Sequence, residues 1–163
     1  HNRLFFVEVM GRHNGFIALS TGIATGAIAV MTPETEITVD GLVQVLAEGQ
    51  KRNKSSSIVI VAEGNLSGGA YKLAQEVKKR TDQYEIRITV LGHLQRGGSP
   101  SCSDRVLASR LGVEAVESLL NGTVNCMVGI VNGSLVHTPF EKAISNKIHT
   151  LKDEVRLARI LSI

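Results

Sequence analysis

The sequence predicts an α/β fold: a largely parallel, Rossmann-like sheet in a three-layer αβα arrangement, with an antiparallel hairpin at one edge. Three observations support this fold class. Short runs rich in Val, Ile and Leu alternate along the chain with segments of helical periodicity. The run at residues 57–62 is almost wholly β-branched or apolar, as in strands buried on both faces. Asn132-Gly133 stands between two apolar runs and is a strong hairpin signal.

The expected strands are short apolar runs that stop at turn or breaker residues. Pro33 ends the second run, because proline has no N–H to give to a strand ladder. Right-handed crossovers between parallel strands then place helices on both faces of the sheet. The expected strands are residues 4–10, 27–31, 57–62, 86–91, 126–131 and 134–137.

The expected helices show apolar residues three and four positions apart. Gly22 and Gly26 suit close packing of the first helix, and Ser101 with Asp104 forms a capping-box pattern before the fourth. The expected helices are residues 13–23, 39–51, 70–80, 101–120 and 153–163. The expected inward-facing residues are Leu73, Ala74 and Val77, then Leu107, Leu111, Ala115 and Leu119, then Val155, Ala158, Ile160 and Leu161.

Length and composition narrow the class of protein. A chain of 163 residues fits one domain with a sizeable core, so we expect a single α/β domain over residues 1–163. No apolar run reaches the roughly 18 residues that a membrane span needs. The net charge of +3 comes from scattered Lys and Arg, which favours small acidic substrates over nucleic acid. The chain starts without Met, close to a strand, so we expect a piece of a longer protein.

The two cysteines and an isolated histidine carry little functional signal. Cys102 and Cys126 lie far apart and show no metal-ligand spacing. This use of cysteine favours a reducing, cytoplasmic setting, and the apolar run around Cys126 predicts a buried thiol. His137 lies in a polar edge segment, where a solvated side chain is expected.

The most informative stretch runs from residues 86–91, a β-rich run typical of a buried strand, into a loop that holds His93, Gln95 and Arg96. Ligand crevices of open α/β sheets lie just past the carboxyl ends of strands. Arg96 offers several donors in a fixed fork, and His93 can be neutral or charged near pH 7. Gly97 and Gly98 allow backbone amides to approach an anion closely. The loop predicts an anion site, with a turn carrying surface His and Arg as the alternative.

Two other strand ends also carry charged residues. Gly11-Arg12 follows the first strand and Glu63 follows the third. Because carboxyl ends of parallel strands share one sheet edge, we expect these residues to converge with the His93 loop. Arginines suit phosphate oxygens and a carboxylate suits sugar hydroxyls, so the set predicts a site for a phosphorylated polyol. The alternative is an ordinary ion pair between Glu63 and an arginine.

These residues carry a resemblance to a known family. The strings Val7-Glu8-Val9-Met10-Gly11-Arg12, Ile60-Val61-Ala62-Glu63-Gly64 and Leu91 to Pro100, followed by Asp104-Arg105, resemble the C-terminal half of bacterial 6-phosphofructokinases. The resemblance extends from His1 to the last helix. It implies a glycolytic, cytoplasmic enzyme that transfers the γ-phosphoryl group of ATP, with Mg²⁺, to the 1-hydroxyl of fructose 6-phosphate.

The resemblance also implies roles for single residues. Those expected to bind the sugar phosphate within one subunit are Met10, Gly11, Glu63, His93 and Arg96. Arg3 and Arg87 match arginines that reach the 6-phosphate of a neighbouring subunit's substrate, in a homotetramer when the protein is full length. Arg12 matches an arginine near the transferring phosphoryl group, where a cation stabilises developing charge.

A basic turn that contains Arg52 and Lys54 matches an effector site of allosteric bacterial members. There it binds the phosphates of a nucleotide or of phosphoenolpyruvate. A solvated turn is the alternative. Ile28 departs from the family pattern, because allosteric members carry at this position a Glu that helps hold the effector's metal ion.

The larger departure is the half of the family pattern that these residues do not contain. The family's ATP loop, its catalytic aspartate and most of its Mg²⁺ contacts belong to an N-terminal domain, so we expect no metal site and no activity from this chain alone. The phosphoryl donor, ATP or pyrophosphate, is also decided there. Two alternatives stay open: a pyrophosphate-dependent phosphofructokinase, and a non-catalytic sugar-phosphate binding module.

Overall fold

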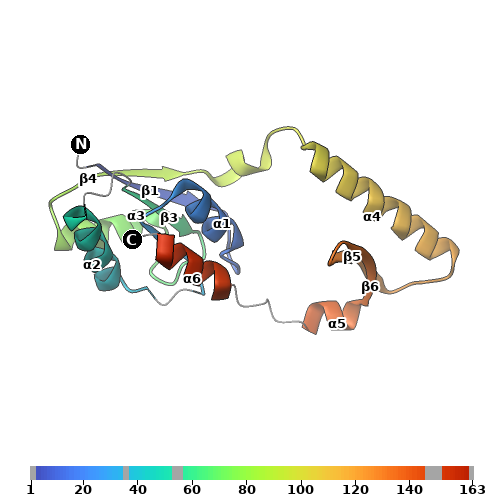
Figure 1. Ribbon diagram of the computed structural model, residues 1–163. Coiled ribbons are helices and arrows are strands. Elements are labelled where there is room, and N and C mark those ends of the chain that lie inside the picture. Colours follow the sequence, from blue (N-terminus) through green and yellow to red (C-terminus); the bar gives the residue numbers. More distant parts are fainter. Residues whose placement is uncertain (1–2, 35–36, 53–56, 146–151, 162–163) are drawn as a thin grey trace. The chain divides into compact units, whose positions relative to one another are not determined.

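The computed structural model describes residues 3–34, 37–52, 57–145 and 152–161. The chain divides into two compact units, and each is described by itself (Figure 1). The sheet unit comprises His1–Gly97 and Thr150–Ile163, and the hairpin unit comprises Gly98–His149. One domain over the whole chain therefore stays a prediction.

The sheet unit is built on four parallel strands in the order β2-β3-β1-β4. Their bounds are Arg3–Val9 for β1, Ala29–Met31 for β2, Ile58–Ala62 for β3 and Glu85–Val90 for β4. The predicted parallel sheet is confirmed. The expectation of a buried strand at 86–91 is wrong, because β4 lies at the edge of the sheet and its residues are half-buried or exposed.

Helices cover both faces of this sheet, which confirms the three-layer arrangement. Helices α2 (Val39–Lys51) and α3 (Ala70–Arg80) pack on one face, with Leu4 and Phe6 of β1 at the centre of that core. Helices α1 (Phe16–Thr25) and α6 (Lys152–Leu161) pack on the other. The predicted inner residues of α3 are all buried, namely Leu73, Ala74 and Val77. In α6 the prediction fails for Ile160 and Leu161, which are 53% and 47% exposed.

Gly22, within α1, and Gly26, which follows its last residue, have different structural roles. A Cβ on Gly22 would come within 2.2 Å of Val30 Cγ2, so Gly22 lets α1 pack closely on β2 as predicted. Gly26 has open space around it and a φ of 64°, and it ends α1 in the left-handed conformation. Close packing was therefore the wrong reason for Gly26.

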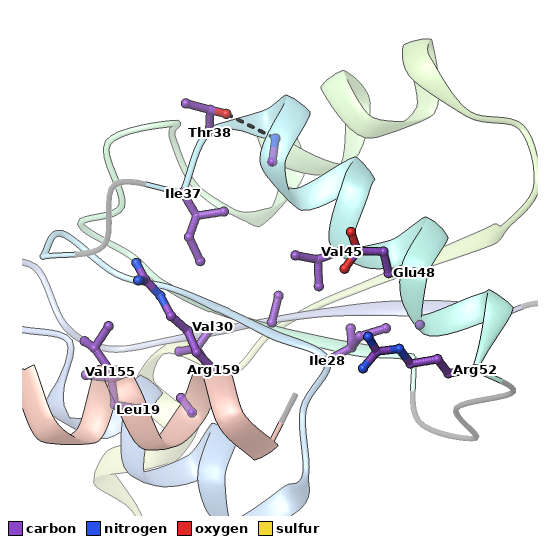
Figure 2. Close-up of a pocket in the computed structure, with 14 residues that line it drawn as sticks. Leu19, Ile28, Val30, Ile37, Thr38, Val45, Glu48, Arg52, Val155 and Arg159 are labelled. Atoms are coloured by element: carbon purple, nitrogen blue, oxygen red, sulfur yellow. Dashed lines mark hydrogen bonds between the residues drawn. The ribbon is translucent and has the colours of Figure 1, made fainter. Parts of the chain in front are cut away.

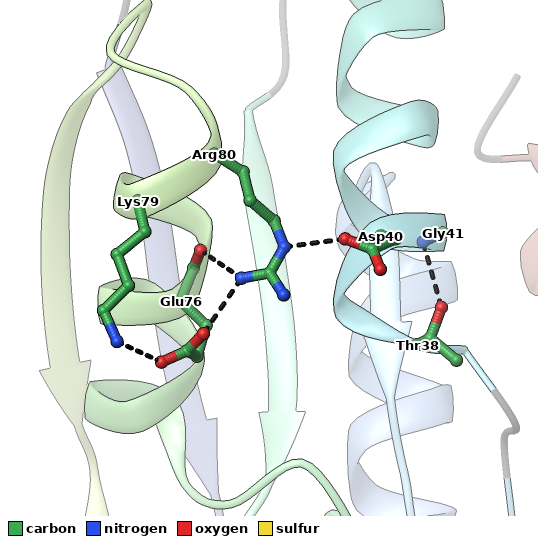
Figure 3. Close-up of polar contacts among 6 residues, drawn as sticks. All are labelled: Thr38, Asp40, Gly41, Glu76, Lys79 and Arg80. Carbon is green, nitrogen blue, oxygen red and sulfur yellow. Dashed lines mark hydrogen bonds and ion pairs between the residues drawn. The ribbon is translucent and has the colours of Figure 1, made fainter.

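An exposed ion-pair network joins α3 to α2 (Figure 3). The Arg80 guanidinium donates from Nε to Asp40 Oδ1 over 2.6 Å and from Nη1 to Glu76 Oε2 over 2.9 Å. A hydrogen bond from Lys79, and to a smaller extent one from Arg80, lowers the pKa of the Glu76 carboxyl. These side chains are solvent-screened, so the network aligns the two helices more than it stabilises them.

The hairpin unit holds α4 (Cys102–Leu120), β5 (Cys126–Val131), β6 (Ser134–Pro139) and α5 (Phe140–Ser145), of which α5 was not predicted. Strands β5 and β6 pair antiparallel through a turn in which Asn132 and Gly133 both have positive φ, at 52° and 80°. The hairpin is therefore confirmed. Its predicted place at an edge of the parallel sheet is wrong, because among the described strands β5 and β6 pair only with each other.

Helix α4 begins with the predicted capping box. Asp104 Oδ2 accepts from Ser101 N over 2.8 Å, and Ser101 Oγ accepts from Asp104 N over 3.2 Å. The predicted buried stripe is wrong, since Leu107 and Leu119 are 43% and 65% exposed. Cys126 is only half-buried, so the prediction of a buried thiol also fails.

Candidate functional site

The carboxyl ends of β3, β1 and β4 meet at one edge of the sheet unit, as the sequence predicts. Glu63 N donates to Val9 O over 3.0 Å, and Leu91 N donates to Glu8 O over 3.1 Å. Parallel pairing therefore continues to the last residue of each strand. The segments that begin at Met10, Glu63 and Gly92 leave the sheet side by side.

A side chain of the β4 loop ties these segments together. Residues Gly92–Arg96 form a short 3₁₀ helix, η1, where the sequence predicted only a loop. Within η1, Gln95 Oε1 accepts a hydrogen bond of 2.8 Å from Met10 N. This contact fixes the turn that carries His93 and Arg96 against the turn that carries Arg12. Sequence reasoning gave Gln95 no role, because the bond joins positions 85 residues apart.

Glycines bring the first two turns into contact. A Cβ on Gly64 would lie 1.9 Å from the carbonyl oxygen of Arg12, so only glycine lets these two backbones approach this closely. Gly64 N donates to Gly11 O over 3.2 Å. Gly11 itself has a φ of 149°, in the region that favours glycine. The backbone at Gly11-Arg12 is therefore held in one conformation.

Glu8, the last but one residue of β1, also forms a contact near this carboxyl edge of the sheet. Its Oε2 accepts a 2.6 Å hydrogen bond from Ala70 N, at the amino end of α3, where a carboxylate is favoured. From the sequence, Glu8 is only one residue of the string that resembles the family, and no contact is predicted for it. The sequence feature that could have predicted this contact is a charged residue in an otherwise apolar strand.

The charged side chains at this edge point to solvent. Arg12, Glu63, His93 and Arg96 are all exposed, while Met10 and Gly11 are half-buried. Among the described residues, Glu63 forms no ion pair with either arginine, so the structure gives no support to an ordinary ion pair here. Two guanidinium groups, an imidazole and a carboxylate at one edge form a set that can contact a phosphate and hydroxyl groups together.

The predicted glycine cradle after η1 is not formed as expected. Gly97 N already donates to Leu94 O over 3.1 Å, which closes the last turn of η1. This amide cannot at the same time bind an anion. Gly98 has a φ of 95° and begins the hairpin unit.

Arg3 and Arg87 lie elsewhere in the sheet. Arg3 Nε donates to Glu85 Oε2 over 3.1 Å, and Arg87 also forms an ion pair with Glu85. Arg3 is six residues before Val9 in β1, which is about 20 Å at ~3.3 Å per residue. One small ligand cannot contact both Arg3 and the carboxyl edge of the same chain.

The residues that the resemblance links to an effector lie at another place in the sheet unit. Arg52 follows α2 and, with Ile28, lines a pocket of about 380 Å³ beside β2 (Figure 2). Lys54 lies outside the described residues, so its role stays a prediction.

Within the described residues, no three His, Cys, Asp or Glu side chains are grouped so that they could hold a metal ion. This part of the protein does not by itself fit the Mg²⁺ that the resemblance implies. In the same residues, no helix has the length and apolar character to cross a membrane.

Comparisons with known proteins agree with this geometry. Residues 1–119 match the family described as Phosphofructokinase. The chain is 49% identical over 163 residues to ATP-dependent 6-phosphofructokinase 2 of Bacteroides thetaiotaomicron, and 47% identical to ATP-dependent 6-phosphofructokinase 1 of Thermus thermophilus. In each case the match covers 100% of this chain and 50% of the relative. The chain thus spans about half the length of these curated relatives.

A solved structure shows the same likeness. The crystal structure of Pichia pastoris phosphofructokinase in the T-state aligns with a TM-score of 0.82 and 32% sequence identity. That alignment covers 100% of this chain and 20% of the yeast chain.

Proposed function

Since this chain belongs to the phosphofructokinase family, we propose that the full-length protein transfers the γ-phosphoryl group of ATP to the 1-hydroxyl of fructose 6-phosphate. The hydroxyl oxygen forms the new P–O bond, the bond to the β-phosphate oxygen breaks, and ADP and fructose 1,6-bisphosphate result. The hydroxyl proton goes to a base outside this chain. ATP is the proposed donor because relatives that are nearly half identical are named ATP-dependent. This is a glycolytic reaction of the cytoplasm.

The observation that carries the proposal is the shared edge where three strand ends are tied together by Gln95 and Gly64. In this proposal His93 and Arg96 donate to the sugar phosphate, and Glu63 accepts from its hydroxyl groups. Met10 and Gly11 contact it along the backbone. Arg12 lies where a cation stabilises the charge that develops on the transferring group. None of these groups is a general base, so catalysis also requires the other half of the protein.

Arg3 and Arg87 are proposed to serve the substrate of a neighbouring subunit. The distance of about 20 Å along β1 keeps Arg3 from its own chain's site. Both arginines are exposed on the sheet face, where Glu85 holds them together. A homotetramer places such a pair at the 6-phosphate of an adjacent site, with Mg²⁺ and ATP bound mainly by the other half of the protein.

Calorimetric titration with fructose 6-phosphate tests the proposal. In the full-length protein, Arg96→Ala removes a charge-assisted contact worth ~1.5–3 kcal/mol, so the affinity falls about ten- to a hundredfold. Arg156→Ala, on an exposed face of α6, is the matched control and leaves the affinity unchanged. An Arg96→Ala protein with unchanged affinity for fructose 6-phosphate contradicts the site. A coupled assay that shows no turnover of the full-length protein with ATP contradicts the reaction.

A further inference from the structure

The turn of residues 10–15, which follows β1, is held at both ends by side chains from the segments that follow the two edge strands, β4 and β2. At its first residue, Met10 N donates to Gln95 Oε1 over 2.8 Å. At its last residue, Gly15 N donates to both carboxylate oxygens of Glu34, over 2.9 Å and 3.1 Å. We call this segment the β1 turn.

The backbone between these two ends has little freedom. A Cβ on Gly64 would lie 1.9 Å from the carbonyl oxygen of Arg12, so the turn lies directly against the segment that follows β3. Gly15 is buried, and a Cβ there would lie 2.4 Å from Thr32 Cβ and 2.6 Å from Glu34 Oε2. Only glycine allows approaches this close. The hydrogen bonds at the ends therefore act on a backbone with few alternative conformations.

Glu34 is itself fixed in place. It is half-buried and follows Pro33, whose ring restricts the backbone. Thr32, one residue earlier, is fully buried, and its carbonyl oxygen accepts a hydrogen bond of 3.4 Å from Asn65 Nδ2. The Glu34 carboxylate also lies at the amino end of α1, where negative charge is favoured. An acceptor placed in this way restrains the amide that it binds.

The Arg12 side chain has no comparable restraint of its own. It is exposed, and among the described residues its guanidinium forms no hydrogen bond or ion pair. Its direction therefore depends on the backbone that carries it. A catalytic group acts only within a narrow geometry, and a misplacement of ~1 Å can cost about a hundredfold in rate. Contacts that hold the β1 turn thus bear directly on what Arg12 can do.

We propose that Glu34 and Gln95 are positioning residues for phosphoryl transfer, which hold the β1 turn at its two ends so that Arg12 stays at the transferring group. This inference rests on the proposed function, in which Arg12 stabilises the developing charge. The two residues differ in reach. Glu34 holds only the β1 turn, whereas Gln95 belongs to η1 and also fixes His93 and Arg96 relative to that turn.

The test measures kcat and the KM for fructose 6-phosphate in the full-length protein. Glu34→Ala should lower kcat about tenfold and change KM less than about twofold, because it loosens the turn but not η1. Gln95→Leu should lower kcat and also raise KM about tenfold, because it frees η1 as well. Glu34→Gln keeps an oxygen that accepts from Gly15 N and should restore most of the lost rate. The matched controls, Gln75→Leu and Asp82→Ala, change exposed residues in and just after α3 and should alter neither constant.

A double-mutant cycle with Arg12→Ala separates positioning from a general stabilisation of the fold. Arg12→Ala alone should lower kcat about a hundredfold. In that background Glu34→Ala should lower kcat by less than about a further twofold, because no guanidinium is left to misplace. Gln95→Leu should lose its effect on kcat there and keep its effect on KM. A residue with only a structural role would lower kcat by the same factor in both backgrounds.

Hydrogen exchange measured by mass spectrometry reports on the β1 turn without any activity. Peptides that span residues 10–16 should exchange about fivefold faster in Glu34→Ala and in Gln95→Leu, because each variant loses a hydrogen bond that holds the turn. Peptides from α3 should exchange as in the unchanged protein, which shows that the variants are folded. If Glu34→Ala does not fold, the cycle with Gln95→Leu decides the proposal.

Several results overturn the proposal. An unchanged kcat in a folded Glu34→Ala protein shows that Arg12 needs no such restraint. Equal losses of kcat with and without Arg12 leave Glu34 and Gln95 a structural role only. An unchanged kcat of Arg12→Ala removes the proposed role of Arg12 and the positioning role with it. A full-length protein without turnover contradicts the proposed reaction instead, and exchange at residues 10–16 then still decides whether the two side chains hold the turn.

Discussion

In the sheet unit, Leu4 and Phe6 of β1 are fully buried, whereas in the hairpin unit Leu119 and Leu120 of α4 are 65% and 82% exposed. The two units differ in architecture more than in composition. Four parallel strands with two helices on each face enclose two cores. Two helices and a two-stranded hairpin enclose little, and isolated two-stranded hairpins are at best marginally stable.

The difference shows where the stability of this chain arises. Every buried apolar residue among those described belongs to the sheet unit, and Ser118 is the buried residue of the hairpin unit. Apolar residues lie on several sides of α4, a pattern found in helices that are buried all round. Within the described residues, burial of apolar side chains therefore stabilises the sheet unit more than it stabilises the hairpin unit.

The largest expected effect comes from the same substitution made in both units. Leu4→Ala removes a side chain with 0% exposure and leaves a cavity, so it should lower the free energy of unfolding by ~2–5 kcal/mol. Leu119→Ala, at 65% exposure, should change it by less than ~0.5 kcal/mol. Urea unfolding followed by circular dichroism measures both. Equal losses would show that α4 is buried in solution and would contradict the comparison.

A smaller effect is expected from the polar contact inside the hairpin unit. Ser118 Oγ donates to Glu114 O and lies 2.6 Å from His137 Nε2, so it joins α4 to β6. His137 is therefore not the merely solvated side chain that the sequence predicted. Ser118→Ala removes this contact, worth ~1 kcal/mol, and should speed amide exchange in β6 about fivefold.

The matched control for Ser118 is Ser109 on the same helix. Ser109 Oγ donates to Arg105 O over 2.9 Å and, among the described residues, forms no hydrogen bond with a residue distant in the sequence. Ser109→Ala should leave exchange in β6 unchanged. If both variants speed exchange in β6 equally, the effect comes from the helix backbone and not from the contact with His137.

Elements with local signals were predictable from the sequence. The predicted helix at 39–51 has the same bounds as α2, because Thr38 caps its amino end through Gly41 N. The Asn132-Gly133 turn and the capping box at Ser101 depend only on neighbouring residues, and both were found. In the candidate site, the three strand ends were predictable because parallel strands place their carboxyl ends at one edge.

What the sequence could not provide are contacts between distant residues. The bond from Met10 N to Gln95 and the ion pair of Arg3 with Glu85 each join positions more than 80 residues apart. No periodicity marks such pairs. The stripe of α4 was predicted as inward-facing because periodicity identifies apolar positions but does not identify the surface that covers them. The edge position of β4 was missed for the same reason.

The smallest expected effect concerns one exposed carboxylate in each unit. A hydrogen bond from Arg3, and to a smaller extent the charge of Arg87, lowers the pKa of Glu85 in the sheet unit. Hydrogen bonds from the Ser101 hydroxyl and N–H lower the pKa of Asp104 in the hairpin unit. A lowered pKa contributes stability above the pKa of the unfolded chain, and this is lost as pH falls through the folded value. Both contributions should therefore disappear on acidification.

Carbon NMR titration of the two carboxyls distinguishes their causes. Arg3→Gln should raise the pKa of Glu85 only, and Ser101→Ala that of Asp104 only. Salt should raise the pKa of Glu85 more than that of Asp104, because it screens an exposed ion pair but leaves a local hydrogen bond intact. The hydrogen bond from Arg3, the largest cause of the low Glu85 pKa, exists only while β1 and β4 are paired, whereas the low Asp104 pKa needs only the first turn of α4. A low Asp104 pKa that persists in mild urea after Glu85 has returned to its ordinary value would reverse the order of stability inferred for the two units.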